Sequence, residues 1–283
     1  MPTALVDGIT TRYEITGDGP PLLMYSPGGF DSRLENWSSF GLYARLGLLS
    51  VLSREFTCIT FDRRESGCSG GRVEAVGWPQ YVAQGKGLLD HLGIERAFLM
   101  GGCVGCSSVV AFAVAHPRTV AGMVLYSPAG GPHYRITQQQ RFSTHATFVA
   151  EQGLGAVTEL ARESDATFTK DPRVGPWVSV LRHDAAFAGA YAQRDPWSYL
   201  EIVTDICRRQ FDRDTVPGAE PGELMVLRTP ALIVPGDDRS HAPSAAHYLR
   251  ECLPESQLWD APVAEQTAET APNMVRDFLH SLA

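Results

Sequence analysis

The chain has 283 residues, of which 44% are hydrophobic and 20% are charged, and its formal net charge is -8. A chain of this length and composition can bury a sizeable apolar core, which excludes a largely disordered protein. The acidic balance makes nucleic acid an unfavourable partner.

The six cysteines are scattered along the chain, which favours a reducing compartment over a disulfide framework. Their spacing does not match a zinc site. The N-terminus lacks a basic segment followed by an apolar one, and no apolar run is long enough for a membrane span. We therefore expect a cytoplasmic protein without a metal or organic cofactor, whose partner is a small molecule rather than a membrane. A homodimer is left open.

Strand and helix patterns alternate over residues 1–129. Residues 4–16 alternate in polarity and turn at Asp7-Gly8, which predicts a β-hairpin. Short apolar runs that stop at turn residues predict four more strands, and helical spacing predicts three helices. We expect these strands at 21–27, 56–62, 96–102 and 120–128, and the helices at 38–53, 78–92 and 104–116.

Between 130 and 225, helical segments rich in aromatic residues follow one another without a clear strand. Alternation then resumes, with strands expected at 229–236 and 256–260 and helices at 244–252 and 271–282. This order predicts an α/β protein with a mostly parallel sheet, helices on both faces and a helical cap inserted after the sixth strand. We expect a core domain at 1–129 and 226–283, and the cap at 130–225.

A parallel sheet binds its ligands at the carboxyl ends of its strands, where SPGGF, DRRESGCSG, GGCVG and GDDRSH fall. In GGCVG a strand turns directly into a helix, so the residues two positions before and after Cys103 must be small. Gly101 and Gly105 satisfy this condition. The corner would push the Cys103 thiol outward at the amino end of a helix, whose dipole favours a thiolate.

This corner resembles the nucleophile elbow of the α/β-hydrolase superfamily, which usually reads G-x-S-x-G. Cysteine stands in the serine position, as in enzymes of the dienelactone-hydrolase type. The resemblance covers nearly the whole chain and implies that Cys103 is a nucleophile. It also implies an oxyanion hole made by the N–H groups of Gly28 or Gly29 and of Val104.

The resemblance assigns the catalytic acid to the VPGDDRSHAP loop, where Asp238 is preferred over Asp237. Asp238 would orient a base or polarise water. The DRRESGCSG stretch is similar to the family's D-x-R-G-x-G-x-S loop, from which Glu65 and Ser66 depart.

A catalytic histidine is also implied in the loop before the closing helix, but the corresponding residues 261–272 contain none. The nearest polar residue, Gln266, cannot transfer protons. Another histidine is one solution: His241 is the strongest candidate, and His133 and His145 at the start of the cap are alternatives.

Two other solutions stay open. A thiol of pKa about 8.5 that is acidified by a helix N-terminus tolerates the loss of its base better than a serine does. Alternatively, the scaffold performs non-covalent lyase, cyclase or decarboxylase chemistry, or only binds a ligand. Two further hypotheses for Cys103 do not depend on this resemblance: it forms a redox pair with Cys106, or it is a small buried residue.

The interpretation we favour is an enzyme with an atypical triad, a hydrolase or acyl-transfer enzyme in which Cys103 attacks. Its substrate would be a small, partly apolar carbonyl compound: an ester, lactone, thioester or activated carbon–carbon bond. Arg135 and Arg141 of the cap would contact a substrate carboxylate or lie solvated at the surface. Cys68 is expected to pack within its loop.

Overall fold

A mostly parallel sheet of eight strands lies at the centre of the structure, a computed structural model that describes residues 1–282. The strand order is β1-β2-β4-β3-β5-β6-β7-β8, and only the pairs β1–β2 and β2–β4 within this described sheet are antiparallel. The predicted fold class is confirmed, and each predicted strand is present. The strands are β1 (Thr3–Val6), β2 (Ile9–Thr16), β3 (Pro21–Tyr25), β4 (Thr57–Phe61), β5 (Ala97–Gly102), β6 (Val120–Tyr126), β7 (Ala231–Val234) and β8 (Ser256–Leu258).

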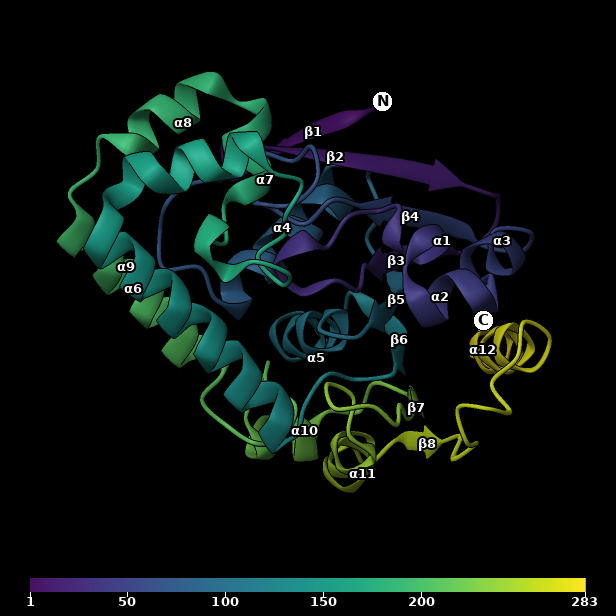
Figure 1. Cartoon of the computed structure of the whole chain (residues 1–283). Coiled ribbons are helices and arrows are strands. Elements are labelled where there is room, and N and C mark those ends of the chain that lie inside the picture. The colour runs from purple at the N-terminus through teal and green to yellow at the C-terminus, as the bar shows by residue number, and fades with distance from the viewer. Residues whose placement is uncertain (283) are drawn as a thin grey trace.

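Helices cover both faces of the sheet (Figure 1). Successive side chains of a strand point to opposite faces, so Leu23 and Tyr25 of β3 join one apolar cluster while Leu22 and Met24 join the other. The first cluster is completed by α4 (Trp78–His91), α5 (Gly105–Ala115) and α11 (Pro243–Cys252), and the second by α1 (Asn36–Ser39), α2 (Gly41–Leu46), α3 (Leu48–Leu52) and α12 (Thr270–His280).

The prediction of a single helix at 38–53 is wrong, because this segment forms the three short helices α1, α2 and α3. Gly41 and Gly47 have φ angles of 44° and 61°, which an α-helix interior does not contain. A glycine in the left-handed region ends a helix at little steric cost. Apolar spacing alone does not show such a break, since the same face stays buried on both sides of it.

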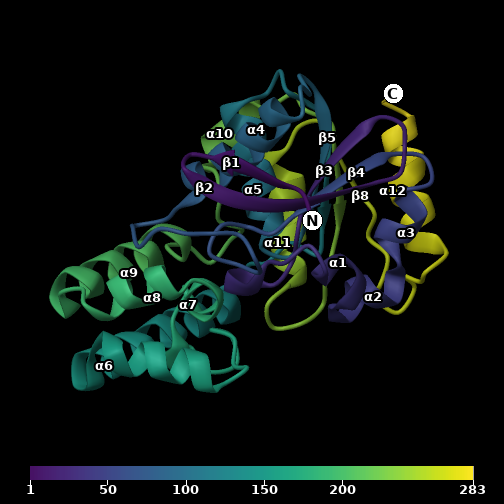
Figure 2. The same ribbon diagram turned by 90° about the horizontal axis from the view of Figure 1, so that it is seen from above.

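A helical cap follows β6, as predicted, and lies beside the sheet domain (Figure 2). Its longest helix, α6, is kinked at Gly153, where φ is 75°. The short helix α10 packs against α5 and α11 of the sheet domain, so the cap boundary at 225 stays a prediction. The bounds are α6 (Pro132–Glu163), α7 (Val178–His183), α8 (Ala185–Ala192), α9 (Pro196–Gln210) and α10 (Pro221–Val226), with 3-10 turns η1 (Gly29–Asp31) and η2 (Pro172–Val174).

Two structural features concern a membrane or a metal ion as partner. Within residues 1–282, no helix combines the length and apolar character that a membrane crossing requires. The same residues contain no group of three or more histidine, cysteine, aspartate or glutamate side chains arranged to hold a metal ion.

Candidate active site

Cys103 occupies a sharp corner between β5 and α5, and its φ angle of 56° lies in the left-handed region. Such an angle is strained for a residue with a side chain. The two flanking glycines make the corner possible. A Cβ atom on Gly101 would lie 2.5 Å from the Cys106 nitrogen, and one on Gly105 would lie 2.3 Å from the Tyr25 carbonyl oxygen. The predicted steric reason for both glycines is confirmed.

The Cys103 thiol is only partly buried and faces backbone N–H groups of Val104 and Gly28. Burial raises the pKa of this thiol. The positive charge of His241 and the two N–H groups outweigh that effect and hold the pKa below its ordinary value. The surroundings of Cys103 at the start of α5 therefore favour the thiolate form more than those of an ordinary cysteine do.

The side chain of Asn36, in α1, holds the loop that contains Gly28. Its side-chain amide donates to the carbonyl oxygens of Pro27 and Asp31, both at 2.7 Å. Gly28 has a φ of 122°, and a Cβ atom there would lie 2.5 Å from the Asn36 amide nitrogen. Of the two expected glycines, Gly28 is the one whose N–H acts on the sulfur, and the role of Gly29 stays a prediction.

The loop after β7 carries Asp238 and His241, which form an ion pair. The His241 Nδ1 atom lies 2.9 Å from Oδ1 and 2.8 Å from Oδ2 of Asp238. The backbone N–H groups of Ser240 and His241 also donate to Oδ1, at 2.7 Å and 3.1 Å. Gly236 makes room for this turn, because a Cβ atom there would lie 2.5 Å from the His241 Cβ.

The charges of this pair are coupled to Cys103. The hydrogen bond from His241 lowers the pKa of Asp238 to about 2. Burial lowers the pKa of His241, but the negative charges of Cys103 and Asp238 outweigh it and raise the pKa to about 10. The other ring nitrogen of His241, Nε2, is buried without a partner of regular hydrogen-bond geometry in the described chain.

The structure thus brings together Cys103, His241 and Asp238 at one edge of the sheet. Asp237, the alternative acid, is exposed, and its side chain makes no hydrogen bond to the described residues. The arrangement has the parts of a nucleophile, a base and a group that orients the base.

The side chain of Gln266, at the position where a histidine was expected, has hydrogen-bond partners other than Cys103, His241 and Asp238. It is fully buried, and its Oε1 accepts a hydrogen bond of 2.9 Å from the Tyr126 hydroxyl. Its Nε2 donates to the carbonyl oxygens of Pro235 and Ala261 at 2.9 Å and 3.0 Å. The amide is fully used in holding together the ends of β6, β7 and the loop after β8.

The two cap histidines also lie outside the cluster around Cys103, one because it is buried in the cap and the other because it is exposed. His145 is buried between the Tyr199 hydroxyl, 2.6 Å from Nε2, and the Arg173 carbonyl oxygen, 3.1 Å from Nδ1. Burial lowers the pKa of His145 to about 4, which keeps the ring neutral. His133 is exposed in the first turn of α6. The structure brings neither into the cluster around Cys103.

The cap arginines differ in their surroundings. Arg135 pairs with Asp214 at 3.1 Å on the surface. Arg141 is half-buried, and its charge acts on Cys103 and on the buried Tyr134 of the same helix. Tyr134 was not recognised in the sequence as a residue of this site.

Two other cysteines near the site, Cys106 and Cys68, differ in burial. Cys106 is buried, and its thiol donates to the Gly101 carbonyl oxygen at 3.2 Å. Burial raises the pKa of Cys106 well above its ordinary value, which disfavours a redox pair with Cys103. The prediction for Cys68 is wrong, because this residue is exposed in its loop. Its backbone N–H, rather than its side chain, is the anchored part, donating to Asp62 at 2.8 Å.

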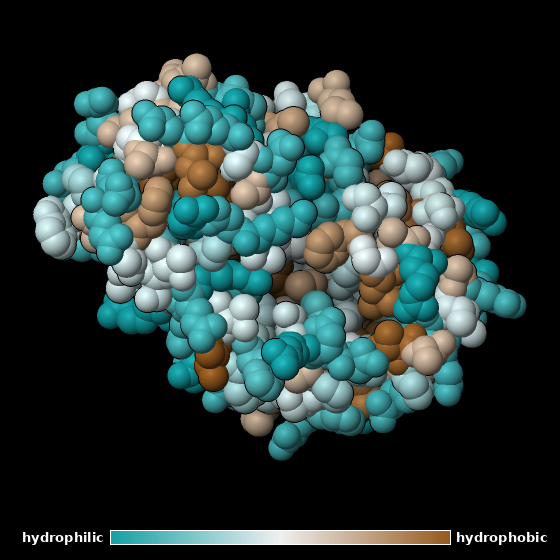
Figure 3. Space-filling view, in the orientation of Figure 1, coloured by the Kyte–Doolittle hydropathy of each residue, from teal (hydrophilic) through white to brown (hydrophobic). Residues whose placement is uncertain are grey.

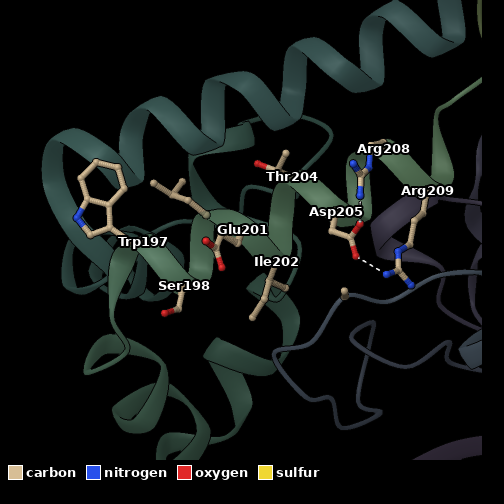
Figure 4. A pocket seen from close by; sticks show the side chains of 10 residues that line it. Trp197, Ser198, Glu201, Ile202, Thr204, Asp205, Arg208 and Arg209 are labelled. Atoms are coloured by element: carbon tan, nitrogen blue, oxygen red, sulfur yellow. Dashed lines mark hydrogen bonds and ion pairs between the residues drawn. The ribbon is translucent and has the colours of Figure 1, made fainter.

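A surface pocket lies away from Cys103, on the cap. This pocket of about 700 Å³ follows the outer side of α9, lined by Trp197, Asp205 and Arg209 among others (Figure 4). Its Asp205 is paired with Arg209 at 2.6 Å, and its described lining contains neither a cysteine nor a histidine. A second hollow, with apolar residues at its base, opens between the cap and the sheet domain (Figure 3).

The family model described as alpha/beta hydrolase fold matches residues 21–168. The chain is 44% identical over 124 residues to 2-hydroxy-6-oxo-6-phenylhexa-2,4-dienoate hydrolase of Comamonas testosteroni, covering 41% of this chain and 43% of that protein. It is 52% identical over 130 residues to 2-hydroxy-6-oxononadienedioate/2-hydroxy-6-oxononatrienedioate hydrolase of Paraburkholderia phymatum, covering 44% of this chain and 42% of that protein. The matches therefore span less than half the length of these curated relatives.

Solved structures extend the likeness in fold to nearly the whole chain. The crystal structure of the enol-lactonase from Burkholderia xenovorans LB400 superposes with a TM-score of 0.63 at 21% sequence identity. It covers 99% of this chain and 100% of that one. At this identity the likeness concerns the fold alone.

Proposed function

Because the chain belongs to the α/β-hydrolase fold family, we propose that it is a hydrolase in which Cys103 attacks a small, partly apolar carbonyl compound. One observation carries this proposal: the Cys103 thiol, the His241 ring and the Asp238 carboxylate are electrostatically coupled at the elbow. The N–H groups of Gly28 and Val104 lie at the same sulfur, where they can also receive an oxyanion.

In the first step the Cys103 thiolate attacks the carbonyl carbon, and the carbonyl π electrons move to oxygen. The Gly28 and Val104 N–H groups stabilise this oxyanion. When the carbonyl re-forms, the bond to the leaving group breaks, and the His241 imidazolium gives its proton to that group. The products of this step are an acyl-cysteine and a neutral imidazole.

In the second step His241 takes a proton from a water molecule, whose oxygen attacks the acyl carbon. Collapse of the second oxyanion expels the Cys103 thiolate and releases a carboxylic acid. Asp238 keeps the Nδ1 side of the ring hydrogen-bonded, so that Nε2 remains the atom that exchanges protons. The cycle consumes one water molecule and restores the thiolate–imidazolium pair.

The names of the curated relatives suggest which substrates to try first. Both relatives are named as hydrolases of 2-hydroxy-6-oxo compounds with conjugated double bonds. These belong to the activated carbon–carbon bond class, so a compound of this type should be compared with a thioester, an ester and a lactone. The cap between β6 and β7 would cover the bound acyl group, and a small cytoplasmic metabolite fits the proposal.

The test is covalent trapping at Cys103. A chromogenic thioester should give a burst of product and an acyl mass shift on the peptide that contains Cys103. Cys103→Ala should lose the adduct and lower turnover by about 10³-fold or more. Cys68→Ala, which removes an exposed cysteine of a neighbouring loop, is the matched control and should keep both. Full turnover by Cys103→Ala would instead support non-covalent chemistry on this scaffold.

A further inference from the structure

The loop after β4 buries two consecutive arginines in contrasting states. Arg64 is 2% exposed and pairs with Glu65 at 2.8 Å and with Glu74. Arg63 is 5% exposed, yet within residues 1–282 it makes no ion pair. Its Nε and Nη2 atoms are buried without a hydrogen-bond partner in this described part of the chain.

The position of the Arg63 guanidinium is fixed although it binds no acceptor. It lies over the ring of Tyr81, 4.2 Å from the centroid, and 5.3 Å from the centroid of the Phe30 ring. Such cation–π contacts hold a guanidinium by its face and leave the N–H groups at its edge free. Buried donors are nearly always paired, so two unused donors on one fixed group require an explanation.

Arg63 lines a small internal cavity of about 10 Å³ at the start of α5. Val104 and Gly105, the two residues after Cys103, line the same cavity, and so does Ser26, whose hydroxyl also lacks a partner among the described residues. This volume suits one oxygen-sized atom. A water molecule would satisfy a donor, whereas an anionic oxygen would also pair with the guanidinium, on which the Glu65 carboxylate acts through its charge without forming an ion pair.

From this we infer that Arg63 binds an anionic group of the substrate, most simply a carboxylate, whose oxygen enters the cavity beside the nucleophile corner. This inference rests on the proposed function, since it assigns the substrate class of the same site: carbonyl compounds that carry a carboxylate. Arg63 is then a specificity-determining residue. The unpartnered Nε and Nη2 donors lie on the same edge of the guanidinium fork, so both can donate to the one oxygen that the cavity admits.

Arg141 is the competing candidate, because its charge also acts on Cys103. It is only half-buried, so water can solvate its guanidinium when no substrate is bound. Arg63 is 5% exposed, and its Nε and Nη2 atoms are fully buried, so these two donors need an occupant more than the Arg141 guanidinium does. Substitution of each arginine separates the two.

The experiment compares p-nitrophenyl monoesters of succinic, glutaric and adipic acid with uncharged p-nitrophenyl alkanoates of the same chain length. The wild type should prefer the best anionic ester. Arg63→Met should lower kcat/KM for that ester by about 10- to 100-fold, chiefly through KM, and change the neutral esters by less than about 3-fold. Arg162→Met, which removes an exposed arginine of α6, is the control and should leave both activities unchanged.

Two results would overturn the assignment. Equal losses on anionic and neutral esters would make Arg63 a structural residue. Loss of the anionic preference in Arg141→Met but not in Arg63→Met would move the subsite to the cap. If the methionine variant does not fold, Arg63→Lys keeps the charge but not the fork, and should lower activity only on the anionic ester, by about 10-fold.

A binding measurement separates failure of this inference from failure of the proposed function. Glutarate should raise the melting temperature of Cys103→Ala, glutaramide should not, and Arg63→Met should abolish the glutarate effect. This result without ester turnover would retain the anion subsite and reject the hydrolase. Ester turnover without any glutarate effect or anionic preference would retain the hydrolase and reject the subsite.

Discussion

Two loops at the carboxyl edge of the sheet present polar side chains in opposite states. In residues 235–242, after β7, His241 keeps a buried Nε2 without a regular partner in the described chain and is electrostatically coupled to Cys103. In residues 259–269, after β8, Gln266 uses both ends of its amide on the surrounding protein. We therefore expect the base to be the polar group that retains unused hydrogen-bonding capacity, rather than the residue in the loop where a base was expected.

Among the variants that test this comparison, removal of the His241 ring should cause the largest loss of activity. His241→Ala should lower kcat/KM for a thioester by about 10²- to 10⁴-fold, because both proton transfers lose their donor and acceptor. Steady-state kinetics with a chromogenic thioester measures this. The exposed His133→Ala is the control and should stay near the wild type. A loss of less than about 3-fold in His241→Ala would remove this ring from the reaction.

The carboxylate behind His241 should have a smaller effect. Asp238→Asn should lower kcat/KM by about 10- to 100-fold, because the ring loses the partner that orients it, although the 64% exposed Asp238 side chain leaves water as a substitute. Asp237→Asn, in the exposed neighbour, should change the rate by less than about 3-fold. The reverse ranking of the two variants would assign the acid to Asp237.

The smallest effect on activity is expected for Gln266, in the loop after β8. Gln266→Leu should leave kcat/KM within about 3-fold of the wild type and lower the free energy of unfolding by about 1–3 kcal/mol. The cost arises because the Tyr126 hydroxyl and two carbonyl oxygens lose their partner. Urea unfolding followed by circular dichroism measures it, with the exposed Gln257→Leu as control. A stable but inactive Gln266→Leu protein would show that this amide participates in catalysis.

Local stereochemistry determined which features were predictable. The corner at Cys103 was recognisable because Gly101 and Gly105 are required by contacts with their near neighbours in the fold. The pairing of Asp238 with His241 was available as a hypothesis because three residues separate them in one loop. Whether that ring approaches the sulfur depends on how the whole loop folds back, which apolar spacing and motifs do not determine.

The features that were missed depend on long-range packing. The segment 38–53 has helical apolar spacing, but the φ angles of Gly41 and Gly47 divide it. Asn36 supports Gly28 through contacts made only after the chain has folded. The unused donors of Arg63 cannot be seen in a sequence where Arg64 beside it is fully paired.

The pH dependence of Cys103 alkylation tests the thiolate–imidazolium pair most directly. Because the pKa of Cys103 is lowered and that of His241 is raised, the thiolate should persist below the ordinary thiol pKa of about 8.5. Iodoacetamide should therefore modify the wild type rapidly at pH values where free cysteine is protonated. His241→Gln should shift the midpoint of the rate profile upward, towards that ordinary value. Identical midpoints in both proteins would contradict the coupling of Cys103 to His241.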